Sequence, residues 1–109
     1  MAGKPVILEL VTFRTHDGVL EQQFDEAVRS VDGFLAEQPG FLSRQVLTVD
    51  TDGSRVDLVW WKDLAAARAA AESIRTDPRA ASFMSCLDPD SVRVSHARLT
   101  HARPEQLPW

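Results

Sequence analysis

The predicted strands of this chain carry apolar side chains at both even-numbered and odd-numbered positions. This pattern restricts the possible folds more than any other feature. In residues 6–15, apolar side chains occupy both even and odd positions, and the segments 41–50 and 55–62 do the same. A strand of this kind is covered on both of its faces. The sheet therefore needs a packing partner on each side.

A long amphipathic helix is predicted after the first strand. Its apolar residues recur at steps of three and four, which places them on one buried stripe: Leu20, Phe24, Ala27, Val28, Val31 and Leu35. Asp17-Gly18 interrupts the chain before this stripe and is expected to cap the helix. Gln38-Pro39-Gly40 is expected to end it.

The second half of the chain has a similar alternation of strands and helices. Segments 41–50 and 55–62 form a hairpin, with Gly53 in the turn at positive φ. A second helix follows Asp63 with this apolar face: Leu64, Ala67, Ala71 and Ile74. Asp77-Pro78 starts a short helical piece with this apolar side: Ala80, Phe83, Met84 and Leu87. Residues 92–100 form the fourth strand.

The element order β-α-β-β-α-β predicts an α+β fold of the ferredoxin-like type. Its antiparallel four-stranded sheet carries both helices on one face. We expect a single domain over residues 1–101 and a polar C-terminal tail over residues 102–109.

Two helices cover only one face of such a sheet, so the other apolar face needs a different partner. The simplest partner is a second copy of the chain packed sheet to sheet, which predicts a homodimer with a twofold axis. The alternative is a monomer that exposes an apolar sheet face.

Composition excludes several classes of protein. The 12 Lys and Arg residues are scattered among 16 Asp and Glu, giving a net charge of −4, which argues against nucleic-acid binding. No apolar run approaches the ~20 residues of a membrane span and no signal-peptide pattern is seen, so we expect a cytoplasmic protein. The single Cys86 excludes a Cys-rich metal site, and the three histidines form no metal set.

The chain resembles the antibiotic-biosynthesis-monooxygenase-like domains of the dimeric α+β barrel superfamily. Over residues 5–101 the resemblance rests on the element order and on three motifs: Pro39-Gly40-Phe41, Trp61-Lys62-Asp63 before an alanine-rich helix, and Asp77-Pro78 with Phe83-Met84. It implies a dimeric barrel with a small-molecule site between sheet and helices. Members include cofactor-free oxygenases of aromatic polyketides, haem-degrading enzymes and small isomerases, so the fold alone does not define the activity.

The resemblance also implies roles for particular residues. In the polyketide-oxygenase branch a tryptophan at the end of the third strand lines the site, and Trp61 matches it. That branch has an asparagine four residues earlier, where this chain has Asp57, and a tyrosine whose matching region reads Ala67 here. The haem-degrading branch needs an axial histidine, and none lies between Leu64 and Leu87.

Glu9 is a carboxylate within an otherwise apolar strand, where an unpaired charge is costly. Either it pairs with a cation such as Arg98 on the fourth strand, or it acts as a general base in a cavity. The fourth strand turns either His96 and Arg98, or another set, toward the helices: Ser95, Ala97 and His101. Histidine changes charge near neutral pH, so His96 is a second candidate base.

These observations lead to one functional hypothesis and one alternative. The hypothesis is a small monooxygenase or isomerase, with neither cofactor nor metal, acting on an aromatic or polyketide-like metabolite. Its expected catalytic residues are Trp61, Glu9, Asp57 and His96, and its expected substrate-binding residues are Val11, Phe13, Phe83 and Arg98. The alternative is a dimer that binds a small molecule, or assists another protein, without catalysis.

Overall fold

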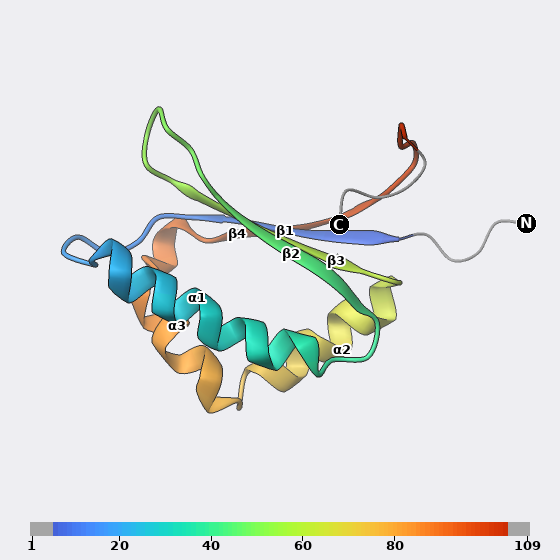
Figure 1. Ribbon diagram of the computed structural model, residues 1–109, viewed down its shortest axis with the longest axis horizontal. Helices are drawn as coiled ribbons and strands as arrows, with labels where there is room; N and C mark the ends of the chain where they lie inside the picture. The colour runs from blue at the N-terminus through green and yellow to red at the C-terminus, as the bar shows by residue number, and fades with distance from the viewer. Residues whose placement is uncertain (1–5, 105–109) are drawn as a thin grey trace, which may run out of the picture.

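The computed structural model describes residues 6–104, which form one sheet with all helices on one side (Figure 1). The strands are β1 (Ile7–Phe13), β2 (Phe41–Thr48), β3 (Arg55–Trp61) and β4 (Arg93–Arg98). They pair antiparallel in the order β2-β3-β1-β4. This is the predicted ferredoxin-like α+β fold. Residues 105–109 of the expected tail lie outside the described residues.

Three α-helices and two short 3-10 turns connect the strands. The helices are α1 (Glu21–Ala36), α2 (Leu64–Ile74) and α3 (Ala81–Cys86), and the turns are η1 (Pro78–Ala80) and η2 (Pro89–Ser91). Helix α2 starts after Asp63 as predicted, and Asp63 caps it, because its Oδ1 accepts a hydrogen bond of 2.8 Å from the Ala66 amide. Asp77 caps η1 in the same way and Pro78 follows it, also as predicted.

The expected start of the first helix is wrong. Leu20 occupies the N-cap position, and no side chain caps the helix there. Asp17 lies three residues further from the helix, too far for its carboxylate to serve the first amides. Leu20 was expected on the buried stripe and is instead 69% exposed.

A bulge in β2 decides which of its residues face the helices. Phe41 pairs with Trp61, but the register then shifts by one residue, so that Arg44 pairs with Val59. Phe41 and Val46 therefore both pack against the core between sheet and helices, although they differ in parity. Simple alternation along this strand cannot produce that arrangement.

The core lies between the helices and the inner face of the sheet. Three phenylalanines meet there, with ring centroids 5.7–6.1 Å apart: Phe13, Phe24 and Phe83. The buried face of α2 is Ala66, Ala67 and Ala70, rotated from the predicted face. Small side chains in this position let the helix approach the sheet closely. Met84, expected on the apolar side of α3, is 51% exposed.

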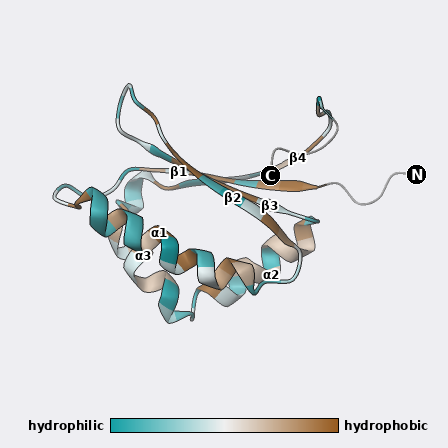
Figure 2. Cartoon of the chain, viewed as in Figure 1, coloured by the Kyte–Doolittle hydropathy of each residue, from teal (hydrophilic) through white to brown (hydrophobic). Residues whose placement is uncertain are grey.

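The outer face of the sheet is covered by no helix of the described chain (Figure 1). It carries apolar side chains from the three longest strands, namely Leu8, Leu10, Leu47, Val56, Leu58 and Trp60. Figure 2 shows apolar stretches along the strands as well as along the helices. We refer to these six residues below as the outer apolar patch.

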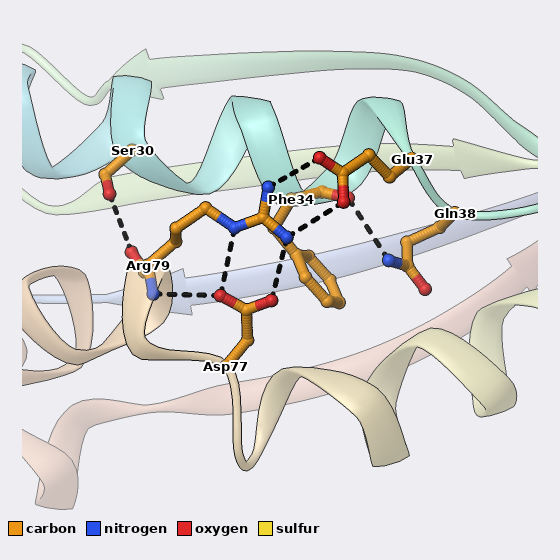
Figure 3. Close-up of polar contacts among 6 residues, drawn as sticks. All are labelled: Ser30, Phe34, Glu37, Gln38, Asp77 and Arg79. Atoms are coloured by element: carbon orange, nitrogen blue, oxygen red, sulfur yellow. Dashed lines mark hydrogen bonds and ion pairs between the residues drawn. The ribbon is translucent and has the colours of Figure 1, made fainter.

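Arg79 ties the end of α1 to the segment that follows α2 (Figure 3). Its guanidinium donates to both carboxylate oxygens of Glu37, at 2.7 and 3.0 Å, and to both of Asp77, at 3.0 and 2.8 Å. It also lies 5.7 Å from the centroid of the Phe34 ring, and its backbone carbonyl accepts a bond from Ser30. Hydrogen bonds from Arg79 lower the pKa of Asp77 to about 2 and lower that of Glu37 as well.

This cluster predicts a loss of stability in acid. Both carboxyls have a folded pKa below their ordinary values of 3.8 and 4.5, so their contribution is complete above those values. The free energy of unfolding is expected to fall as the pH is lowered from about 5 toward 2. In an Arg79→Met variant the fall should be shallower, as measured by urea denaturation across this range. Arg75→Met, at an exposed pair, serves as control. Equal slopes in Arg79→Met and the parent would contradict this assignment.

Candidate active site

A cavity of about 240 Å³ lies between the inner face of the sheet and the helices. Its wall is mostly apolar, and three of its members, Ala71, Met84 and Val94, are exposed. The mouth therefore lies among α2, α3 and β4. The lining residues are Glu9, Val11, Val31, Phe34, Leu35, Asp57, Val59, Trp61, Ala70, Ala71, Ile74, Phe83, Met84, Leu87, Val92 and Val94.

Strand alternation places the functional side chains of the cavity. Glu9 pairs with Val59 and Val11 with Asp57, so odd positions of β1 and β3 share the inner face. Trp61 continues the row at the end of β3. The two carboxylates, Glu9 and Asp57, are thus diagonal neighbours on adjacent strands in an otherwise apolar wall.

Trp61 is 1% exposed and forms part of the cavity wall. Its ring meets that of Phe41 edge to face, with centroids 5.9 Å apart. The indole Nε1 is buried and has no hydrogen-bond partner among residues 6–104. A buried donor without a partner costs stability, which the packing of the indole in the core must offset.

Asp57 is held by Arg44, a residue that the sequence analysis did not single out. Arg44 Nε donates to Asp57 Oδ1 at 2.9 Å and Nη2 donates to Oδ2 at 2.7 Å. Its Nη1 donates to the Val28 carbonyl and to Asp32. The Arg44 side chain is 4% exposed and its guanidinium lies 5.4 Å from the centroid of the Phe83 ring.

Two opposing effects act on the pKa of Arg44. Burial lowers it, but the hydrogen bonds and charges of Asp57 and Asp32 together raise it above its ordinary value. Arg44 therefore stays charged, and the pair is a fixed polar element in the core. The sequence feature that could have predicted this ion pair is the opposite charge of Arg44 and Asp57 at diagonal positions of the predicted hairpin.

Glu9 has a different partner from the one expected. His96 Nε2 lies 3.2 Å from Glu9 Oε2, whereas Arg98 pairs in register with Ile7, one step along β1. Strand register thus turns His96 and Arg98 to the inner face, which settles the two orientations left open for β4. The carboxylate of Glu9 lines the cavity, and His96 lies behind it near the sheet edge.

The other expected site residues are divided between places. Val11 and Phe83 line the cavity. Phe13 is buried in the aromatic cluster and is not part of the wall. Arg98 lies with His96 in a separate shallow hollow beside Leu64.

Residues 6–104 contain no group of three or more His, Cys, Asp or Glu side chains arranged to hold a metal ion. Within the same residues, no helix has the length and apolar character needed to span a bilayer.

The arrangement combines two chemical capacities. The apolar wall favours a flat, uncharged ligand. The two carboxylates have unlike partners, the guanidinium of Arg44 for Asp57 and the imidazole of His96 for Glu9, so their surroundings differ.

Comparisons with known proteins show which solved structures share this architecture. No protein-family model matches the sequence, and no curated protein matches it. A mutant of SnoaB, a cofactor-independent oxygenase from Streptomyces nogalater, is 25% identical over 96% of this chain and 99% of its own, with a TM-score of 0.66. A candidate antibiotic biosynthesis monooxygenase from Bordetella bronchiseptica is 13% identical over 90% of this chain and 100% of its own, with a TM-score of 0.76.

A third neighbour is a dimeric ferredoxin-like protein of unknown function from Jannaschia sp. CCS1. It is 17% identical over 86% of this chain and 99% of its own, with a TM-score of 0.63. The neighbours agree in fold and span oxygenases as well as proteins without an assigned role. The chain therefore has the ferredoxin-like α+β fold of the antibiotic-biosynthesis-monooxygenase-like proteins within the dimeric α+β barrel superfamily.

Proposed function

We propose that this protein is a small cofactor-independent monooxygenase that acts on an aromatic metabolite in the cavity between sheet and helices. The observation that carries the proposal is an apolar cavity whose wall holds Trp61 and the two carboxylates Glu9 and Asp57. The likeness to SnoaB, described as a cofactor-independent oxygenase, supports the reaction class.

In this proposal Glu9 is the base and His96 orients it. Glu9 takes a proton from a phenolic hydroxyl or from an activated ring carbon, which leaves an electron-rich carbanion or phenolate. That anion passes one electron to dioxygen, which gives a substrate radical and superoxide. These two radicals combine at the ring carbon and form a peroxide. Breakage of the O–O bond leaves one oxygen as a carbonyl of the product and the other as water. Trp61, Val11 and Phe83 hold the ring, so the protein supplies orientation and electrostatic stabilisation.

The test is oxygen uptake and quinone formation with 1-naphthol and with anthrone. In each reaction one molecule of substrate and one of O₂ give one molecule of quinone and one of water, so the reaction balances. Turnover of 1-naphthol above the uncatalysed background is expected, with less from the larger anthrone, and Trp61→Phe should reduce it roughly tenfold or more by loosening the fit of the ring. Trp60→Phe is the matched control, because Trp60 lies on the outer face of the same strand.

The outcome decides between the proposal and its alternative. Background rates in the parent protein with both substrates would overturn the assignment as an oxygenase. Binding without turnover would instead favour a non-catalytic small-molecule-binding dimer, a reading supported by the absence of any tyrosine in the chain.

We propose further that the protein is a homodimer whose subunits meet through the outer apolar patch. An uncovered apolar face of this extent is unusual in a monomer. A twofold axis lets the same patch cover itself, and the Jannaschia neighbour of the same fold is described as dimeric.

A charge at the centre of the patch tests the dimer. Leu58 pairs with Leu10 in the middle of the sheet. Leu58→Asp is expected to convert a dimeric protein into a monomer in sedimentation velocity at micromolar concentration, since the carboxylate would be buried without a partner. Ala69→Asp on the exposed side of α2 should remain dimeric. A monomeric parent protein at the same concentration would overturn the proposal.

A further inference from the structure

Asp57 is a polar group of the cavity wall whose hydrogen-bonding capacity is only partly used. A carboxylate has about four acceptor positions. Among residues 6–104, Asp57 receives two hydrogen bonds, both from Arg44, one on each oxygen. Acceptor positions therefore remain on a buried carboxylate that lines the cavity.

Arg44 makes this acceptor rigid. The guanidinium is held by Asp57 on one side and by Asp32 and the Val28 carbonyl on another, and it lies against the Phe83 ring. Two parallel N–H bonds fix the plane of the Asp57 carboxylate. A ligand therefore meets an acceptor of fixed direction in a wall that otherwise offers almost only apolar atoms.

The volume of the cavity limits the size of the ligand. A cavity of about 150 Å³ with an apolar wall holds one benzene molecule. The present cavity, at about 240 Å³, has room for one ring or two fused rings. A third fused ring would extend through the mouth into solvent.

We propose that the cavity selects uncharged ligands of one or two aromatic rings that carry a hydroxyl group, and that Asp57, positioned by Arg44, accepts the hydrogen bond from that hydroxyl. This inference rests on the cavity being the ligand site of the proposed function. Glu9 and Asp57 together disfavour a ligand that enters as an anion, because a third negative group would lie among two carboxylates in an apolar wall. The anion of the proposed reaction forms only when Glu9 has taken up the proton and is neutral.

Titration calorimetry of the parent protein with two probes of equal size tests the inference. 1-Naphthol carries the donor, and 1-methoxynaphthalene has the same rings without it. The hydroxyl is expected to strengthen binding roughly ten- to a hundredfold, the range for a hydrogen bond to a charged group. 1-Naphthoate should bind at least tenfold more weakly than 1-naphthol.

Variants assign the preference to Asp57. Asp57→Asn replaces two acceptor oxygens by an amide that also donates, so the ratio between the two probes should fall to about threefold or less. Arg44→Met/Asp57→Leu removes the whole pair and keeps the volume apolar, and it should bind both probes equally. This double variant keeps the test valid if Asp57→Asn does not fold. Glu72→Gln, in an exposed ion pair on α2 that is not part of the cavity wall, should keep the parent ratio.

The outcomes separate this inference from the function on which it rests. Equal affinity of the parent protein for 1-naphthol and 1-methoxynaphthalene would overturn the hydroxyl selection and leave the cavity as a ligand site. If the double variant still prefers 1-naphthol over 1-methoxynaphthalene as strongly as the parent protein does, the ligand hydroxyl donates to a group other than Asp57, and the assignment is wrong. Absence of binding by both probes would count against the cavity itself, and with it against the proposed function.

Discussion

Arg44→Met is expected to lower the free energy of unfolding by about 3–5 kcal/mol, the usual cost of breaking a buried ion pair by removing one partner. The variant leaves the Asp57 carboxylate in the core without the two hydrogen bonds that it receives from Arg44. It also removes the contact with Phe83 and the bond to the Val28 carbonyl. Urea denaturation followed by circular dichroism measures the change.

The double variant Arg44→Met/Asp57→Leu distinguishes the net contribution of the ion pair to stability from the cost of leaving one buried charge without its partner. With both charges gone, the interior holds apolar groups of similar volume, and most of the lost stability should return. Glu72→Ala, in an exposed pair at 4.0 Å, provides the control and should change stability by less than about 0.5 kcal/mol. A single variant Arg44→Met as stable as the parent would show that the pair contributes nothing to folding.

Gly40→Ala is expected to cost about 2–5 kcal/mol, because two effects add at this position. Gly40 has φ of +84°, a conformation that disfavours any side chain. A Cβ there would also lie 2.7 Å from the Ala66 Cβ and 3.0 Å from the Lys62 Cγ. Relief of this overlap requires α2 to move away from the start of β2. The same denaturation measurement applies.

Gly53→Ala is the matched control for Gly40→Ala. Gly53 has a similar φ of +73°, but a Cβ at that position meets no atom within 4 Å. It should therefore show only the conformational cost, about 1–2 kcal/mol. Equal losses at the two glycines would mean that the close packing of Gly40 against α2 has no energetic weight.

Much of this fold follows from regularities that are local in the sequence. Strand parity puts Glu9 and Val11 on the same face of β1, and the hairpin turn at Gly53 has the expected positive φ. The caps at Asp63 and Asp77 follow from the preference of aspartate for the residue before a helix. Such features depend on few neighbouring residues, so they can be predicted from one chain.

Features that depend on distant contacts could not be predicted in this way. The bulge between Phe41 and Ser43 depends on how β2 pairs with β3, and it turns Phe41 to the same face as Val46. Without it, Phe41 would share the outer face with Leu47. The partner of Glu9 was missed for a similar reason, because a shift of two residues in the register of β4 exchanges His96 for Arg98.

The strict alternation of β3 has a consequence for how such proteins diversify. Asp57, Val59 and Trp61 face the cavity, while Val56, Leu58 and Trp60 face the side that we assign to the second subunit. Substitutions at neighbouring codons therefore act on different traits, one on ligand choice and the next on assembly. A lineage can change what it binds through the odd positions while the even positions preserve its quaternary structure.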